Sequence, residues 1–334
     1  MTENAGSLLS TVKNIKFDRF VLAILAMIVL GKLAPQAGIY RGTINLDMIS
    51  NIGVSLIFLF YGIKLSPEKL RSDLGNWHLH LVVQVATFLV FPLIALVGMR
   101  LFATPTSQLL WLGTFFMAAL PSTVSSSVVM VSIAKGNVPA AIFNASISSL
   151  AGVFITPLWM GVALGSASTA MGDLSGIIIK LIIQVLVPVA LGMMLNRRFG
   201  AWANRHGKGL KLFDQSVILL IVYISFSESF HKNLFAELSW VNLLVLSVGA
   251  ITLFYAVYGL ISTTSKVLRF NREDRITALF CGSKKSLVHG TVMSSILFDG
   301  MGSLGIILLP IMIYHALQLV LVSFIAQRMS LEVD

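Results

Sequence analysis

Long apolar runs make up most of the chain, and short groups of charged residues, glycines and prolines separate them. Each run is close to the ~20 residues that an α-helix needs to cross a bilayer, whereas a membrane β-barrel would show alternating segments of ~10 residues. The pattern therefore predicts an all-α polytopic membrane protein. The ten predicted spans are 19–34, 46–65, 78–99, 108–134, 138–164, 176–195, 213–230, 239–263, 275–297 and 301–327.

Composition agrees with this pattern, because 56% of the 334 residues are hydrophobic and only 11% are charged. The net charge of +10 does not indicate nucleic-acid binding, since the basic residues lie in short loops between apolar runs. Cys281 is the only cysteine, which excludes an intrachain disulfide and a cysteine-based zinc site. There is no HExxH, GxSxG or GxxxxGK[ST] motif, and no soluble segment is long enough for a nucleotide-binding domain. We therefore expect no enzyme, no catalytic residue, no metal site and no cofactor.

The basic residues also predict the orientation. With a cytoplasmic N-terminus, the inner segments hold 17 lysines and arginines and the outer segments hold 4, which is the asymmetry of the positive-inside rule. An even number of spans then puts both termini in the cytoplasm. The first ~16 residues are polar and lack the apolar core of a signal peptide, so the first span should direct insertion into the plasma membrane, the inner membrane of a bacterium.

Ten spans divide into two sets of five, and an odd-numbered unit repeated in tandem must enter the membrane from opposite sides. Two segments support such an inverted repeat, "SSLAGVFITPLWM" (148–160) in span five and "GSLGIILLPIMIY" (302–314) in span ten. Each has a proline seven or eight residues after its Ser-Leu. The predicted layout is a cytoplasmic segment 1–18, a first repeat 19–164, an external loop 165–175, a second repeat 176–327 and a cytoplasmic tail 328–334.

Spans four and nine each contain an interruption at corresponding places in the two halves. Pro121 lacks an N–H donor, and the hydroxyls of the following "STVSSS" segment can bind freed backbone groups. Gly282 and Ser283 interrupt span nine in "CGSKKS". Unwound backbone at membrane depth is tolerated only where protein buries it or water reaches it, so paired breaks point to a transporter's binding site.

Two adjacent lysines, Lys284 and Lys285, follow the second break. Counting nine residues from Arg275 at about 1.5 Å each places Lys284 roughly 14 Å deep, near the middle of the hydrocarbon core. A charge there costs on the order of 2.5–3.5 kcal/mol on insertion scales, which favours a functional role. Adjacent helical residues point ~100° apart, so which lysine faces a cavity stays open. Backbone carbonyls, Asn144 and an anionic ligand are the candidate partners, and we favour the ligand.

Other polar residues within the spans are candidates beside the lysines. His289 follows Lys285 by four residues and could relay protons, or could be a hydrogen-bonded structural histidine. Asn144 and Ser148, one turn apart, suit ligand or ion contact as well as interhelical hydrogen bonding. The predicted substrate-binding set is Lys284, Lys285, Ser125, Ser126, Ser127, Asn144 and His289. The predicted ion-coupling set is Thr87, Ser126, Asn144, Ser148, Ser283 and Lys285.

The sequence resembles the bile acid:sodium symporter superfamily, and within it the divergent branch that includes the orphan seventh member of the vertebrate family. The stretches that carry the resemblance are 57–70, 79–92, 120–157 ("LPSTVSSSVVMVSIAKGNVPAAIFNASISSLAGVFITP"), 185–196 and 278–287 ("ALFCGSKKSL"). The resemblance implies two inverted five-helix repeats, a panel of spans 1, 2, 6 and 7, and a core of spans 3–5 and 8–10. Broken spans four and nine would cross near the site.

The family's sodium ligands are largely replaced in this chain. Their positions fall on Ser125 and Ser126, Ala141 and Ala145, Cys281, Lys285, and Thr87. A cation site usually needs several oxygen ligands and negative charge, whereas here a carboxylate is missing and an ammonium group is present. Lys285 would repel a cation at that position or substitute for it. Sodium coupling of the family's usual kind is therefore not expected.

The function predicted from sequence is secondary transport of a small organic, anionic solute by alternating access. The coupling ion could be Na⁺ at a remodelled site, or H⁺ through a lysine or His289; an uncoupled carrier is also consistent with the sequence. The alternative is a regulatory, non-transporting membrane protein that influences calcium or lipid-precursor handling. Partners are a small solute and the lipid bilayer, and the sequence does not distinguish a monomer from a homodimer.

Overall fold

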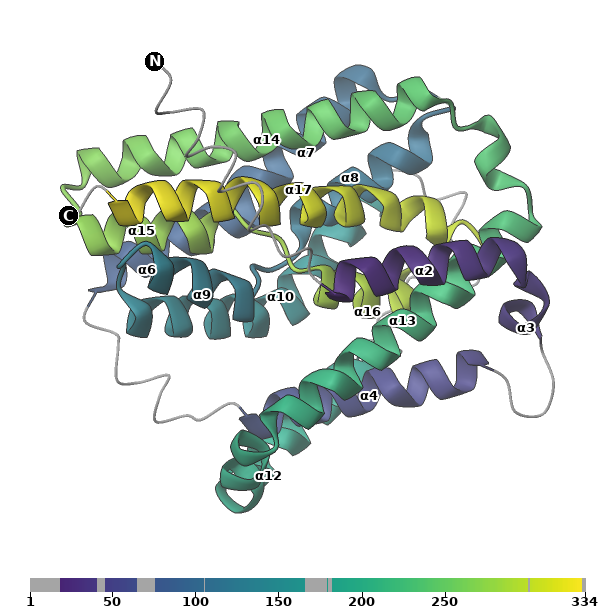
Figure 1. The fold of residues 1–334 in the computed structure, drawn as a ribbon, viewed down its shortest axis with the longest axis horizontal. Coiled ribbons are helices and arrows are strands. Elements are labelled where there is room, and N and C mark those ends of the chain that lie inside the picture. Colours follow the sequence, from purple (N-terminus) through teal and green to yellow (C-terminus); the bar gives the residue numbers. More distant parts are fainter. Residues whose placement is uncertain are drawn as a thin grey trace.

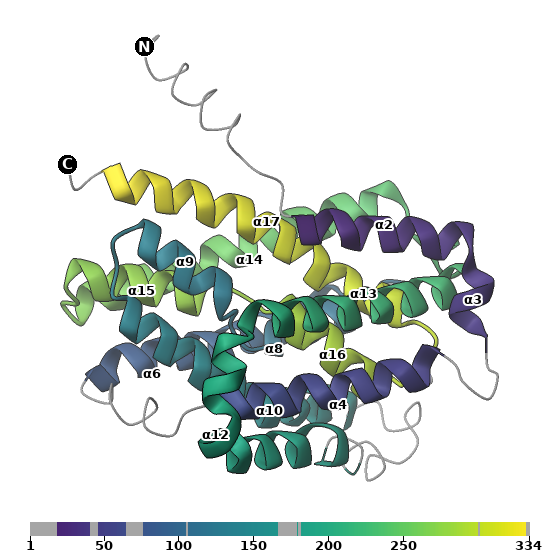
Figure 2. The same ribbon diagram turned by 60° about the horizontal axis from the view of Figure 1, so that its bottom comes forward.

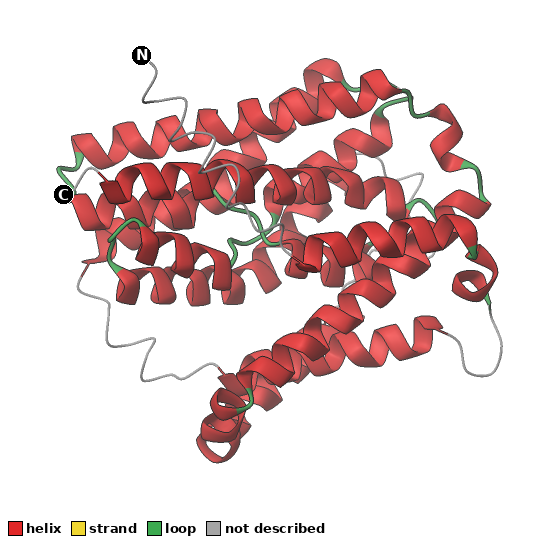
Figure 3. Cartoon of the chain, in the orientation of Figure 1, coloured by secondary structure: helices red, strands yellow, loops and turns green. Residues whose placement is uncertain are grey.

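A computed structural model describes residues 19–40, 46–64, 76–104, 106–165, 179, 182–299 and 301–331. These residues form helices joined by loops and turns, with no β-strand among them (Figure 3). The helices of the first half are α2 (Arg19–Leu33), α3 (Pro35–Ile39), α4 (Leu46–Lys64), α6 (Trp77–Val85), the π-helical turn η2 (Ala86–Val90), α7 (Phe91–Phe102), α8 (Gln108–Ala119), α9 (Ser125–Ile133) and α10 (Val138–Gly165).

The second half follows with a similar alternation of long and short helices. Its elements are the π-helical turn η3 (Ile182–Leu186), α12 (Val187–Arg205), α13 (Gly207–His231), the 3₁₀ turn η4 (Leu234–Glu237), α14 (Trp240–Val267), α15 (Arg272–Gly282), α16 (Leu287–Leu297) and α17 (Leu304–Leu331). Of the predicted segments, 1–18, 166–175 and 332–334 lie outside the described residues, as do residues 176–178, 180 and 181 of predicted span six.

Seven helical stretches among the described residues are long and apolar enough to cross a membrane. They are Leu46–Lys64, Trp77–Phe102, Val138–Ala163, Ile182–Arg205, Gly207–His231, Trp240–Val267 and Leu304–Leu331. Phe20–Leu33 and Gln108–Ala119 are shorter apolar helices. The predicted all-α membrane protein is confirmed, and the helix bounds follow the predicted spans except between spans six and seven. There the helices extend past the apolar runs, to Arg205 and from Gly207, because polar residues continue the helix outside the apolar segment.

Predicted span three contains a π-helical turn that the sequence analysis did not foresee. Pro92 has no N–H, so the carbonyls one turn before it lose their donors, and the N–H of Phe91 bonds Ala86 instead. The indole Nε1 of Trp159 donates to the carbonyl of Phe88 at 2.7 Å. The turn therefore leaves backbone carbonyls that side chains from other helices must satisfy.

The helices pack in two groups that meet along α13 (Figures 1 and 2). In the first group α12 packs along α4, and α13 packs against α2, α3 and α4. The second group contains α6–α10 and α14–α17, in which α8 packs on α7 and α17, and α15 packs on α6, α9, α10 and α14. Because α13 also contacts α16 and α17, it joins the groups.

Glycines allow the closest approach between α4 and α12. A Cβ atom built on Gly62 would collide with the Val189 carbonyl, and one built on Gly192 would collide with the Leu59 carbonyl. Small residues at facing positions let two membrane helices pack backbone to backbone, where van der Waals contact is the main attraction. The first group of helices therefore depends on these two glycines.

Gly192→Ala should lower the free energy of unfolding by about 1–3 kcal/mol, because the added methyl group forces α4 and α12 apart. Gly249→Ala on α14 is the matched control, since a Cβ there meets nothing within 4 Å. Thermal unfolding of both variants in the same detergent tests this. Equal melting temperatures would contradict the prediction.

Candidate functional site

Two interrupted helices meet in the second group of helices. The first interruption lies between Ala119, the last residue of α8, and Ser125, the first of α9; Pro121 lies within it. The second lies between Gly282, the last residue of α15, and Leu287, the first of α16. The Ser286 N–H donates to the Pro121 carbonyl at 2.9 Å, so the two unwound segments are in direct contact. We call this pair of segments, 120–124 and 283–286, the crossover; both are drawn as loop inside the bundle in Figure 3.

The break in the first helix exposes backbone carbonyls at the end of α8, and two other segments supply donors to them. Thr156 Oγ1 of α10 donates to the Ala119 carbonyl at 2.8 Å. Lys285 Nζ donates to the carbonyls of Ala118 and Leu120 at 2.7 and 2.8 Å. Ser148 Oγ accepts the Ser122 N–H at 2.9 Å, which withdraws that donor from the helical bond to Ala118. The backbone groups of Ala118, Ala119, Leu120 and Ser122 thus have partners from elsewhere in the fold, whereas the Met117 carbonyl, which loses the N–H of Pro121, accepts from Leu120 at 3.2 Å.

Residues of the first break in turn satisfy the end of α15. Ser122 Oγ donates to the Cys281 carbonyl at 2.6 Å, and Ser127 Oγ donates to the Phe280 carbonyl at 3.3 Å. The hydroxyl of Tyr314 on α17 donates to the Ser283 carbonyl at 2.8 Å. The two breaks are therefore reciprocal, because each supplies hydrogen-bond donors to backbone carbonyls that the other exposes.

Lys285 is fully buried and its ammonium group has a complete set of partners. Besides the two carbonyls at the end of α8, Nζ donates to the Thr87 carbonyl at 2.7 Å. The ammonium also lies 4.3 Å from the centre of the Phe91 ring, within the range of a cation–π interaction. A cation at a helix C-terminus meets the negative end of the helix dipole. The surroundings of Lys285 thus stabilise its positive charge.

The backbone of Lys285 is held as firmly as its side chain. Its N–H donates to Gln318 Oε1 at 2.9 Å, and Gln318 Nε2 donates to the Lys285 carbonyl at 2.8 Å. One amide side chain therefore replaces both helical hydrogen bonds of an unwound residue. This pairing fixes the direction in which the side chain leaves the crossover.

Lys284 is also fully buried, but its surroundings differ. Within the described part of the chain, Ser126 Oγ is the hydrogen-bond partner of its ammonium group, at 2.8 Å. Ser126 is the second residue of α9, and α9 begins without a side-chain cap. The lysine thus lies at the positive end of a helix dipole, which disfavours a cation. Because an ammonium group has three donors, Lys284 has capacity for a further acceptor.

The structure brings several of the other predicted residues close to the crossover. Asn144 is buried on α10, where Nδ2 donates to its own helix at Ala140, and its carbonyl accepts from Gln84 Nε2 at 3.2 Å. The buried hydroxyl of Thr87 has no hydrogen-bond partner in the described residues, whereas the Thr87 carbonyl binds Lys285. Ser148 holds the backbone of Ser122, so its contact is structural.

The remaining predicted residues lie at the starts and ends of the half-helices. Ser283 Oγ donates to Leu279 at the end of α15. His289 Nδ1 lies 3.0 Å from the Ser286 hydroxyl, and the ring packs edge-on against Tyr61 of α4 with centroids 5.9 Å apart. The His289 ring therefore faces α4 of the first group of helices, and within the described chain it makes no hydrogen bond or ring contact with the groups that bind the two lysine side chains. The side chain of Ser125 lies outside the described residues.

Sequence reasoning missed Gln318, Tyr314 and Phe91, which contact the crossover. Gln318 and Tyr314 are one turn apart on α17, so they lie on one face of a mainly apolar helix. A buried polar face of this kind in a membrane span is a signal that could have pointed to them. Phe91 carries no such signal, because a phenylalanine in an apolar run is unremarkable without its three-dimensional neighbours.

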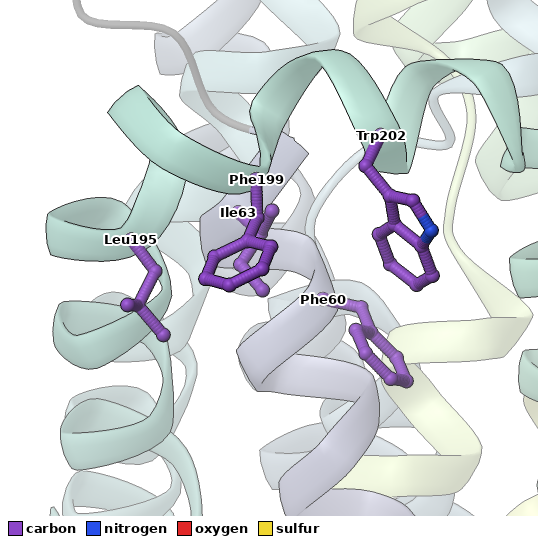
Figure 4. A pocket seen from close by; sticks show the side chains of 5 residues that line it. All are labelled: Phe60, Ile63, Leu195, Phe199 and Trp202. Carbon is purple, nitrogen blue, oxygen red and sulfur yellow. The ribbon is translucent and has the colours of Figure 1, made fainter.

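A pocket occurs elsewhere, between α4 and α12 (Figure 4). It is lined by apolar and aromatic side chains, namely Phe60, Ile63, Leu195, Phe199 and Trp202. No crossover residue lines it. Within the described residues, no group of three His, Cys, Asp or Glu side chains is placed to hold a metal ion.

The fold and the crossover define a multi-pass helical membrane protein in which two interrupted helices meet. A profile of the SBF-like CPA transporter family matches residues 18–331, and the chain belongs to that family. The resemblance to the bile acid:sodium symporter superfamily is confirmed, and the chain is a membrane transporter and not an enzyme.

Relatives match over nearly their whole length. An uncharacterized protein of Pseudomonas aeruginosa is 39% identical over 311 residues, which cover 93% of this chain and 92% of the relative. YfeH of Escherichia coli K12, whose name describes it as a candidate symporter, is 34% identical over 311 residues, with the same two coverages. Sodium/bile acid cotransporter 7 of Danio rerio is 31% identical over 314 residues, 93% of each chain.

Ser148→Ala should destabilise the protein by about 1–3 kcal/mol, because it leaves the buried N–H of Ser122 without an acceptor. Ser146→Ala on the same helix is the matched control, since the Ser146 hydroxyl bonds only its own helix, at Ile142. The free energy of unfolding of that variant should stay within about 0.5 kcal/mol of the wild-type value. Thermal unfolding compares the two, and a stable Ser148→Ala variant would show that the break does not need this acceptor.

Proposed function

We propose that the protein is a secondary active transporter that carries a small organic anion across the plasma membrane by alternating access. The single observation that carries the proposal is Lys284, a buried ammonium group that has one neutral partner among the described residues, at the uncapped start of α9. The ammonium group and the N-terminal end of the α9 dipole both contribute positive potential there, and a carboxylate or similar group would balance both.

The proposed architecture is two inverted five-helix repeats with both termini in the cytoplasm. The first group of helices, α2, α4, α12 and α13, corresponds to the proposed panel, and the second group to the proposed core. Packing of α12 on α4 and of α13 on α2 and α4 supports the panel, and reciprocal capping of the two breaks supports a core with a pseudo-symmetric centre. Alternating access would then be movement of one group against the other.

The two lysines have different proposed roles. Lys285 has three carbonyl partners and an aromatic ring, so it has no remaining donor for a solute. Lys284 has one hydroxyl partner, and Ser126, which makes that contact, is only partly buried. A solute that reaches Ser126 could therefore also reach the Lys284 ammonium. We assign anion binding to Lys284, with Ser126 and the first N–H groups of α9.

Solute exit and entry require a path between the two groups of helices. Tyr61 of α4 donates to the Ser146 carbonyl of α10 at 3.0 Å and packs on His289 of α16. This side chain thus connects the proposed panel to both repeats of the proposed core. Relative movement of the groups would break these contacts, which makes them a reporter of the transport cycle.

Uptake into proteoliposomes tests the proposed function. The probes are radiolabelled taurocholate, benzoate and succinate, as a bulky, an aromatic and a dicarboxylic anion, and choline serves as a cationic control. Sodium and pH gradients are imposed separately, with N-methyl-D-glucamine replacing sodium. We expect saturable uptake of at least one anion and none of choline. Saturable uptake of choline alone would overturn the assignment of an anion.

Lys284→Met should reduce uptake of the accepted anion at least about tenfold, because a loss of 1.4 kcal/mol in binding already corresponds to that factor. Its melting temperature should be unchanged or higher, since the substitution removes a buried charge that the protein balances incompletely. Lys266→Met, at an exposed lysine near the end of α14, is the matched control and should leave uptake unchanged. Full activity of Lys284→Met would remove this lysine from the binding site.

A further inference from the structure

The surroundings of the Lys285 ammonium have the composition of a cation site. Three backbone carbonyl oxygens converge on Nζ, from Thr87 in η2 and from Ala118 and Leu120 at the end of α8, at 2.7, 2.7 and 2.8 Å. The face of the Phe91 ring lies on a further side, 4.3 Å away. Carbonyl oxygens and aromatic faces are the neutral groups that replace the hydration shell of a monovalent cation in buried sites.

The carbonyls are available for reasons that do not depend on the lysine. In a regular α- or π-helix the Thr87 carbonyl would accept from the N–H of residue 91 or 92. The Phe91 N–H instead donates to the Ala86 carbonyl, and Pro92 has no N–H. Ala118 would pair with the Ser122 N–H, which bonds Ser148 instead. The missing N–H of Pro92 and the bond of the Ser122 N–H to Ser148, beside Pro121, therefore leave these oxygens of two different helices without helical partners.

Leu120 completes the cluster because it lies beyond the end of α8 with extended backbone, at φ −71° and ψ 154°. Its carbonyl points away from the helical hydrogen-bond pattern. Buried carbonyls without donors are costly, at about 1–3 kcal/mol each, so the cluster requires a donor or a cation.

The number of partners identifies the form of the lysine. Three acceptors surround Nζ, and only the protonated amine has three N–H donors, whereas the neutral amine has two. Every hydrogen-bond partner of Nζ among the described residues is a neutral carbonyl, so no carboxylate shares the charge. The three carbonyls and the Phe91 ring therefore surround a fully charged ammonium group and stabilise it without any charged partner among the described residues.

We propose that the carbonyls of Thr87, Ala118 and Leu120 and the ring of Phe91 form a monovalent-cation site that the chain fills with its own Lys285 ammonium. A tethered cation cannot dissociate into either aqueous phase. For ion coupling, the consequence is that no sodium ion binds and leaves at this position during transport. That consequence rests on the proposed transport function. The site itself does not depend on what the protein transports.

Removing the ammonium should open the site to small cations of matching size and shape. In Lys285→Ala, propylammonium replaces the three carbons and the nitrogen that the lysine side chain loses. Ammonium and potassium can occupy the cation site but do not fill the space of the aliphatic part of the side chain. N-methyl-D-glucamine is too large and serves as the blank. Lys285→Met fills the space of the stem with an uncharged side chain, so no cation can enter.

Thermal unfolding of the purified full chain in chloride salts of these four cations at equal ionic strength tests the site. We expect Lys285→Ala to unfold at a lower temperature than the wild type in N-methyl-D-glucamine. Propylammonium should then raise its melting temperature saturably, by at least about 3 °C, the shift that roughly 1 kcal/mol produces in a chain of this size. The wild type and Lys285→Met should show no such rise. A rise equal in wild type and Lys285→Ala, or none in Lys285→Ala, overturns the proposal.

A second comparison keeps the proposal testable if Lys285→Ala cannot be purified. Lys284→Met and Lys285→Met lose the same charged group from adjacent buried positions, but only the second leaves three carbonyls without a partner. We expect Lys285→Met to have the lower melting temperature, or the lower yield of folded protein. Equal stability of the two variants overturns the cation site. Because neither measurement involves transport, their failure and the failure of the uptake assay are distinguishable.

Discussion

The crossover depends on one constraint, the need of every buried backbone carbonyl for a partner where water is scarce. Pro121 and Pro92 each remove a donor, and the end of α15 exposes further acceptors. The fold meets the constraint with side chains from other helices, above all with the Lys285 ammonium, which binds three carbonyls at once. Substituting this one group would leave several acceptors unpaired in two helices.

The same helix ends give the two adjacent lysines different surroundings. Lys285 lies at the C-terminal end of α8, where the dipole is negative, and Lys284 lies at the start of α9, where it is positive. The Lys285 charge therefore has three carbonyl partners within the protein, whereas the Lys284 charge has one hydroxyl partner among the described residues. In the proposed transport function the two properties are complementary, because Lys285 would keep the half-helices in place while Lys284 would attract the solute.

Much of the fold was predictable because hydropathy and helix-breaking residues act locally. Pro121 and Gly282 mark places where the structure ends a helix, and the long apolar runs correspond to the observed helices. The π-helical turn at Ala86–Val90 was missed, although Pro92 is visible in the sequence, because a helix can adjust to a proline in several ways. The carbonyls that this turn exposes accept from Trp159 and Lys285, whose donors come from other parts of the fold and are not visible in the local sequence.

The sequence by itself determined the class of protein, the places of most apolar helices, and the presence of two buried lysines at a break. It could not assign the lysines, because ~100° between neighbouring residues shows that they diverge but not what each one meets. The tertiary structure decided that Lys285 points at the carbonyls of Thr87, Ala118 and Leu120, and that Gln318 holds its backbone. These partners are separated from Lys285 by 33 to 198 residues, so only the packing of whole helices brings them together.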